Sequence, residues 1–88
     1  MKTEFKSSFA RDLRKIRDAS LQKQLKEMLE LIERVQSLQE IGDIKKLKGG
    51  DRYYRIRVGD YRMGLILDND TVVFVRFLHR KDLYKYFP

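Results

Sequence analysis

The stretch RYYRIRVGDYRMGLILD, residues 52–68, decides the fold, because its side chains alternate between apolar and polar with a period of two. This period is typical of β-strands, whose successive side chains point to opposite faces of a sheet. Gly59–Asp60 interrupts the alternation with a residue pair that favours a two-residue hairpin turn. We therefore predict two antiparallel strands, at 53–58 and 61–67, joined by this turn.

The sequence that follows continues the β pattern. Asn69–Asp70 predicts a second tight turn, and TVVFVRFL at 71–78 predicts a third strand. Three strands joined by two-residue turns form an antiparallel meander. The remaining segment, HRKDLYKYFP at 79–88, predicts a short tail with at most one helical turn.

The sequence before residue 43 has a helical period instead. Ser7 or Ser8 is the predicted N-cap of a first helix. A second apolar stripe covers 21–41, with Ser20 as its N-cap and Gly42 as its C-terminal stop. The apolar stripe of the first helix consists of Phe9, Leu13 and Ile16.

These segments predict one α+β domain over residues 1–88. Its order is β-α-α-β-β-β, with a short opening strand at 2–7 and two N-terminal helices packed on a small, mainly antiparallel sheet. No apolar run approaches the ~20 residues that cross a bilayer, and the chain has no cysteine. We therefore expect a cytoplasmic protein that has no disulfides and does not contact membranes.

The net charge of +7 is unevenly distributed. Residues 1–43 carry nine Lys/Arg and eight Asp/Glu, whereas residues 44–88 carry eleven and five. A positive half of this kind attracts phosphate backbones, acidic proteins or anionic membranes, although basic residues can also simply keep a small protein soluble. The choice among these alternatives depends on where the basic residues lie.

Strand alternation gathers arginines on one face of the predicted sheet. If the apolar rows meet the helices, Arg55, Arg57 and Arg62 share the opposite face. The third strand ends near Arg62, and guanidiniums this close repel one another unless a polyanion binds them. The predicted site consists of Arg55, Arg57, Arg62, His79, Arg80 and Tyr84. Further predicted RNA contacts are Lys46, Lys48, Arg76 and Lys81.

The cluster suits cleavage of RNA. Because RNA carries its own nucleophile, the 2′-OH, a protein can cleave it by orienting the backbone and neutralising the pentacovalent phosphorane. Arginine binds phosphate bidentately and stays charged at physiological pH. Arg80 can stabilise the departing oxygen, and Tyr84 or His79 can transfer protons. The sequence shows no metal-ligand spacing and no phosphate-binding glycine loop, so we predict neither a metal nor a cofactor.

Each of these residues also has a structural interpretation. Exposed strand arginines and the basic run at 45–48 are often only solvated surface. The lone His79 can be structural, and Tyr84 can close the edge of the core together with Tyr86 and Phe87.

The sequence resembles the RelE side of the RelE/ParE superfamily of type II toxins, over nearly the whole chain. The features that carry this resemblance are LKGGDRYYRIRVGDYR at 47–62, MGLILD at 63–68, VVFVRFLHRKDLYKYF at 72–87 and two helices ahead of them. The resemblance implies the same α+β fold. It also implies an mRNA interferase that enters the ribosomal A site and cleaves mRNA by 2′-OH attack, which leaves a 2′,3′-cyclic phosphate and a 5′-OH.

The resemblance also assigns roles to single residues. Some RelE enzymes have lysines where this chain has Arg55 and Arg57, which are therefore expected to hold substrate rather than transfer protons. His79 occupies a position that is histidine in many relatives. The spacing from Arg80 to the C-terminal tyrosine is shorter here than in some members. The family's central arginine, strand-exit arginine and C-terminal tyrosine correspond to Arg62, Arg80 and Tyr84.

The resemblance further implies a cognate, RelB-like antitoxin with an acidic, flexible segment, and binding to operator DNA only through the toxin–antitoxin complex. The main alternative is a ParE-like gyrase poison without nuclease activity, although ParE-type chains generally lack the strand arginines and the terminal tyrosine. A third possibility is a non-catalytic RNA- or DNA-binding module, but the chain has no helix-turn-helix or aromatic stacking signature.

Overall fold

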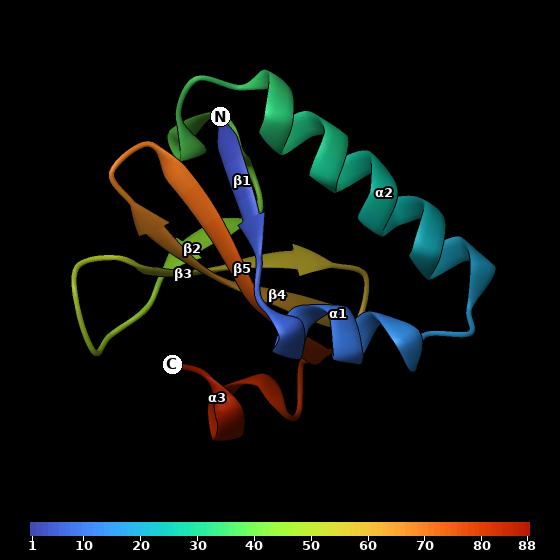
Figure 1. Cartoon of the computed structure of the whole chain (residues 1–88). Helices are drawn as coiled ribbons and strands as arrows, with labels where there is room; N and C mark the ends of the chain where they lie inside the picture. Colours follow the sequence, from blue (N-terminus) through green and yellow to red (C-terminus); the bar gives the residue numbers. More distant parts are fainter.

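The computed structural model describes residues 1–88 and confirms the α+β class (Figure 1). One strand opens the chain, two helices follow it, and the other four strands come after the helices. The elements are β1 (Lys2–Phe5), α1 (Ser7–Arg14), α2 (Ala19–Arg34), the 3-10 turn η1 (Leu38–Glu40), β2 (Ile44–Lys46), β3 (Tyr53–Val58), β4 (Tyr61–Asp68), β5 (Thr71–His79) and α3 (Leu83–Tyr86).

All strands belong to one sheet with the order β1-β5-β4-β3-β2. β1 runs parallel to β5, and the other pairs are antiparallel. Both predicted two-residue turns are present, and Gly59 and Asn69 adopt the positive φ of 59° and 57° that such turns require. The short edge strand β2 is an addition to the predicted order, because its sequence IKK has no alternation to reveal it.

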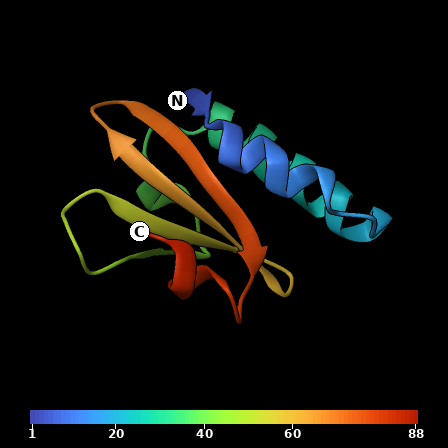
Figure 2. The same ribbon diagram turned by 60° about the horizontal axis from the view of Figure 1, so that its bottom comes forward.

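Helices α1 and α2 cover one face of the sheet, and α3 lies on the other (Figure 2). The main core lies between the two long helices and the sheet, and its largest members are fully buried. They include Phe9, Ile32, Ile56, Met63 and Phe74. The apolar stripes predicted from the sequence therefore point inward. No helix combines the length and the apolar character that crossing a membrane requires.

The predicted serine caps are wrong. The carboxylate of Asp18 caps α2 instead, where its Oδ1 accepts hydrogen bonds from the backbone N–H groups of Ser20 (2.9 Å) and Leu21 (3.2 Å). A carboxylate both accepts these bonds and meets the positive end of the helix dipole. α1 has no side-chain cap, and the Ser8 hydroxyl donates to the backbone oxygen of Val75 (2.6 Å).

The predicted end of α2 at Gly42 is also wrong, since the helix ends at Arg34. The apolar residues beyond it, Leu38 and Ile41, are still buried, but η1 and its flanking loop carry them into the core. Ser37 and Glu40 form a capping box around this turn. The apolar residues therefore keep a helix-like spacing beyond Arg34, although the helix itself ends there.

A second, smaller apolar cluster holds α3 on the opposite face. Its buried members are Leu47, Leu83 and Phe87. The Phe87 ring lies against Gly64 of β4, where an added Cβ would stand 2.7 Å from the ring. Glycine at this position therefore lets the C-terminal segment approach the sheet closely, and the predicted helical turn in the tail is confirmed.

Candidate nucleic-acid interface

The hairpin β3–β4 brings the predicted strand arginines together. Arg57 stands directly opposite Arg62, and Arg55 stands opposite Gly64. Their neighbours along the strands, Ile56 and Met63, are fully buried on the helix side. The three guanidiniums therefore belong to the face that carries α3, as strand alternation predicts.

The electrostatics of Arg62 show which other residues lie near it. Partial burial lowers the pKa of Arg62, and the positive charges of Arg55 and Arg57 lower that pKa further. Tyr84 opposes this shift and Arg80 adds to it, so both stand close enough to act on the guanidinium. We call Arg55, Arg57, Arg62, Arg80 and Tyr84 the arginine site.

Backbone contacts fix the position of Arg62 within this group. Its Nη1 donates hydrogen bonds to the backbone oxygens of Gly59 (3.0 Å) and Tyr61 (2.9 Å). The backbone N–H of Arg80 donates to the oxygen of Asp60 (2.8 Å), which ties the end of β5 to the same turn. The turn at Gly59 therefore sets the spacing of the two arginines to which the sequence assigned catalysis.

Asp43 is a member of this surface that the sequence did not reveal. The Nη2 of Arg57 donates to its Oδ1 (3.1 Å), and the Nη1 of Arg55 donates to its backbone oxygen (3.2 Å). Both partners of the Arg57–Asp43 ion pair are at least half exposed, so the pair is weak and an anion can displace it. The Nε of Arg55 is shielded from solvent and has no hydrogen-bond partner.

His79 is not part of the arginine site. It stands opposite Tyr61 on the helix side of the sheet, with the two rings 5.5 Å apart, and its Nδ1 accepts a hydrogen bond from the backbone N–H of Lys81 (3.2 Å). A β-bulge is the cause. Gly64 pairs with Arg76 and Leu65 with Phe74, so Val75 is an extra residue. After the bulge, each residue of β5 faces the side of the sheet opposite to the one that uninterrupted alternation would give it.

Arg76 is also occupied elsewhere. Its Nε and Nη2 donate to the carboxylate of Asp12 at 2.8 and 3.1 Å, and its guanidinium carbon stands 5.5 Å from the centre of the Tyr86 ring. Hydrogen bonding to Asp12 raises the pKa of Arg76. The sequence predicted an RNA contact here, whereas the structure shows a link between α1, β5 and α3.

The predicted lysine contacts do not share one face, because Lys46 pairs with Tyr54 of the main core and so belongs to the helix side. Lys46 and Lys48 are exposed in and after β2, and Lys81 is exposed beyond the end of β5. Lys45 pairs with Arg55 and so belongs to the arginine face. This position of Lys45 could not be predicted, since β2 was not recognised in the sequence.

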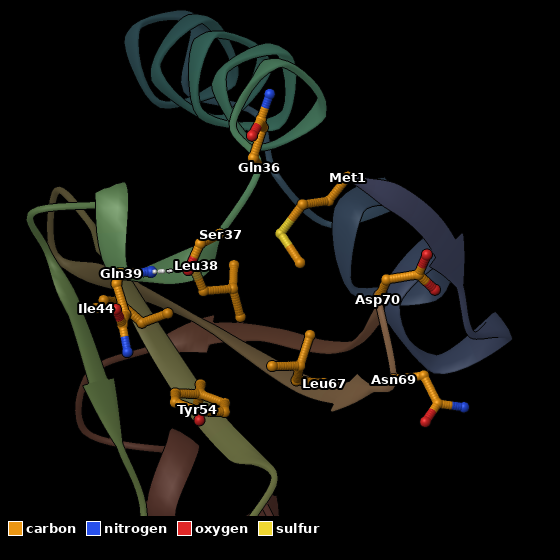
Figure 3. A pocket seen from close by; sticks show the side chains of 10 residues that line it. All are labelled: Met1, Gln36, Ser37, Leu38, Gln39, Ile44, Tyr54, Leu67, Asn69 and Asp70. Atoms are coloured by element: carbon orange, nitrogen blue, oxygen red, sulfur yellow. Dashed lines mark hydrogen bonds between the residues drawn. The ribbon is translucent and has the colours of Figure 1, made fainter.

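A pocket of about 300 Å³ lies apart from these basic residues, between the chain after α2, the N-terminus and the β4–β5 turn (Figure 3). Met1, Leu38 and Leu67 point into it. No lysine or arginine lines it. This pocket is therefore unsuited to phosphate, unlike the face that carries α3.

Comparison with known proteins supplies independent information. The model of the family described as "ParE toxin of type II toxin-antitoxin system, parDE" matches residues 3–84. The chain is also 61% identical, over 46 residues, to Toxin RelE3 of Methanocaldococcus jannaschii, a match that covers 52% of each protein. The matched segments span about half the length of the two curated relatives.

Solved structures match over more of the chain. The RelB-RelE antitoxin–toxin complex from Methanococcus jannaschii contains a chain that is 42% identical, with a TM-score of 0.80 and coverage of 97% of this chain and 99% of that one. The YoeB dimer from Staphylococcus aureus matches with 23% identity, a TM-score of 0.72 and coverage of 91% and 97%. The second match shows the fold alone.

Proposed function

Because the chain belongs to the ParE toxin family of type II toxin–antitoxin systems and is RelE-like in sequence and fold, we propose that it is a ribosome-dependent mRNA endonuclease. The resemblance found in the sequence is thereby confirmed, whereas the reaction is our inference. One observation carries it: Arg62 lies on one sheet face within electrostatic reach of Arg55, Arg57, Arg80 and Tyr84. Such a toxin domain, residues 1–88, inhibits translation by destroying mRNA.

In this proposal the RNA supplies the nucleophile and the arginines supply the charge. The 2′-oxygen attacks the adjacent phosphorus, the bond to the 5′-oxygen breaks, and the products are a 2′,3′-cyclic phosphate and a 5′-OH. Arg62 neutralises the phosphorane, and Arg80 stabilises the departing 5′-oxygen until solvent protonates it. Arg55 and Arg57 hold the flanking phosphates. No step in this scheme requires a metal or a cofactor.

We propose that the phenolate form of Tyr84 accepts the proton of the 2′-OH as the 2′-oxygen attacks, and that the resulting phenol returns this proton to solvent. The sequence left His79 and Tyr84 as alternatives, and their positions favour the tyrosine. Tyr84 acts on the Arg62 guanidinium, whereas the His79 ring lies on the helix side against Tyr61. Because proton transfer needs hydrogen-bond reach to the reacting oxygen, a side chain on the opposite face of the sheet is a poor base.

The partners follow from the same cationic face. We propose that the chain works in the cytoplasm, enters the ribosomal A site and contacts mRNA there. We also propose a cognate, RelB-like antitoxin, whose acidic segment would neutralise the arginine site, and binding to operator DNA only through that complex. The similar toxin from Methanococcus jannaschii was solved as a RelB-RelE complex, which supports the antitoxin proposal.

Primer extension on mRNA bound to ribosomes tests the reaction. We expect specific cleavage by the wild type and none by Arg62→Ala or Arg80→Ala, with unchanged far-UV circular dichroism. Lys26→Ala, on the exposed side of α2, is the matched control that also loses one positive charge. Full cleavage by either arginine variant would disprove the role assigned to that residue.

A ParE-like gyrase poison is the second candidate, since the matching family is described as ParE toxins. Its fold would be the same, and the arginine site would have no catalytic use. DNA supercoiling by gyrase distinguishes the two. If the induced protein stops growth and supercoiling while leaving ribosome-bound mRNA intact, the nuclease proposal is wrong.

A further inference from the structure

The turn between β5 and α3 carries Arg80, and hydrogen bonds from three successive backbone N–H groups hold it. The N–H of Arg80 donates to the backbone oxygen of Asp60 (2.8 Å), and the N–H of Asp82 donates to the backbone oxygen of His79 (2.8 Å). Between these two, the N–H of Lys81 donates to Nδ1 of the His79 ring (3.2 Å). Of the three acceptors, only the ring nitrogen belongs to a side chain.

The His79 ring is anchored on the helix side of the sheet. It stands edge-on to the Tyr61 ring with the ring centres 5.5 Å apart, and Tyr61 stacks on Phe77 at 5.2 Å. Phe77 is a buried member of the main core. The turn that this ring bonds carries Arg80 within electrostatic reach of Arg62. The His79 ring therefore connects the core to the arginine site through the backbone of the turn.

The bond from Lys81 to His79 depends on the protonation state of the ring. As in an Asx turn, the side chain of one residue accepts a hydrogen bond from the backbone N–H two residues later. A neutral imidazole has one acceptor nitrogen, whereas an imidazolium donates from both nitrogens. Proton uptake at Nδ1 therefore places two donors against each other, and the bond is lost. Histidine is the side chain that commonly changes charge between pH 5 and 8.

The groups around His79 favour release of the turn when the ring is protonated. The ring lines a pocket of about 240 Å³, and the titratable groups beside it come from α1, β4 and the turn: Asp12, Lys15, Tyr61 and Asp82. Asp12 is already paired with Arg76. Asp82 thus provides the carboxylate that an imidazolium can bind in exchange for the lost contact with Lys81.

We propose that His79 is a positioning residue: its neutral ring holds Arg80 in the arginine site through the hydrogen bond from Lys81, and protonation of the ring releases the turn. This inference rests on the proposed function and adds to it a residue that touches neither the RNA nor the reacting atoms. When the turn is released, Arg80 stabilises the departing 5′-oxygen less well. Cleavage is therefore expected to weaken as the ring becomes protonated.

Two substitutions at His79 separate the hydrogen bond from the packing of the ring. His79→Asn keeps a neutral acceptor for the N–H of Lys81 but loses the ring, whereas His79→Phe keeps a ring against Tyr61 but has no acceptor. On ribosome-bound mRNA at about pH 8, we expect His79→Asn to keep kcat within about twofold of the wild type. His79→Phe should lower kcat about fivefold, the effect of one ordinary hydrogen bond, and leave KM unchanged. An active His79→Phe with an impaired His79→Asn would overturn the proposal in favour of packing.

The pH dependence of kcat provides a readout that packing alone does not change. The ratio of the wild-type kcat to that of His79→Asn cancels the contributions of Tyr84 and of the ribosome, because both proteins share them. We expect this ratio to be constant above about pH 7.5 and to fall about fivefold by about pH 5.5, since only the wild type loses its acceptor. A ratio that does not change with pH would contradict the role of the ring.

NMR of the free protein distinguishes failure of this inference from failure of the proposed reaction. In the wild type, the Lys81 amide and Arg80 Nε–H signals should shift over the same pH range as the His79 ring, and in His79→Asn neither should shift in that range. If these signals follow the ring but the wild type cleaves no mRNA, the reaction is wrong and the link between His79 and the turn stands. If the wild type cleaves mRNA but the Lys81 amide does not respond to the ring, the positioning role is wrong.

Discussion

The buried carboxylate of Asp12 provides a sharp test of how the fold supports the arginine face. The side chain is only 1% exposed, although it carries a charge. It accepts hydrogen bonds from Nε and Nη2 of Arg76 at 2.8 and 3.1 Å and from the backbone N–H of Phe77 at 2.9 Å. Asp12 thus joins α1 to β5 directly after the bulge. Asp12→Ala removes all three of these hydrogen bonds.

The expected loss follows from the groups that the substitution leaves without a partner. The backbone N–H of Phe77 is buried, and an unsatisfied buried donor costs about 1–3 kcal/mol. Breaking a fully buried ion pair costs about 3–5 kcal/mol, but the Arg76 side chain is 21% exposed, and water recovers part of that cost. We therefore expect Asp12→Ala to lower the free energy of unfolding by about 3 kcal/mol. Domains of this length have roughly 4–13 kcal/mol of stability, so the effect is large.

Urea unfolding followed by circular dichroism measures this loss. With an m-value of about 1.5 kcal/mol/M, a loss of 3 kcal/mol lowers the midpoint by about 2 M. Asp12→Asn keeps an oxygen acceptor for Phe77 and should lose about half as much, and Asp51→Ala in an exposed loop should lose nothing measurable. A shift for Asp12→Ala equivalent to less than 1 kcal/mol would refute the view that this contact fixes α1 to the sheet.

Three other substitutions and one change of conditions test the remaining geometry. Gly64→Ala places a Cβ 2.7 Å from the Phe87 ring. We therefore expect the free energy of unfolding, measured in urea, to fall by about 1–3 kcal/mol, and mRNA cleavage to weaken because α3 moves. Wild-type cleavage by this variant would show that α3 can shift freely. Tyr84→Phe should reduce kcat at least a hundredfold, whereas His79→Gln should change it less than fivefold, and the reverse order would exchange the two roles. Ribosome affinity should fall steeply with salt, with a log–log slope near −3 for about four phosphate contacts, and a flat dependence would contradict an electrostatic interface.

The sequence was most informative where a local feature determines the backbone. Gly59 and Asn69 tolerate the positive φ of two-residue turns, so both hairpins and the register that joins Arg57 to Arg62 could be predicted. Side-chain alternation then placed the strand arginines correctly. The exposed edge strand β2 was missed, since three residues give no period to measure.

The predicted position of His79 differs from the observed one because of an extra residue in β5. Uninterrupted alternation from Phe74 would place Arg76 on the helix side and His79 among the arginines. The extra residue Val75 reverses this order, because Phe77 then faces the core opposite Met63 and His79 follows it. Nothing in TVVFVRFL marks a bulge, since its partner Gly64 is equally explained by the close approach of Phe87. Such a defect depends on tertiary packing that the sequence does not display.

The ion pair of Arg76 reduces the repulsion among the strand arginines. The bulge places Arg76 on the α3 face, opposite Gly64, and Asp12 of α1 neutralises it there at 2.8 Å. The other strand guanidiniums have no buried partner, and Arg57 has only the half-exposed Asp43. A ligand that binds the folded state stabilises it in proportion to the logarithm of its concentration. An anion bound across Arg55, Arg57 and Arg62 would relieve their mutual repulsion. We therefore expect either an acidic antitoxin segment or RNA to stabilise the chain against unfolding. The two ligands should also compete for the arginine site.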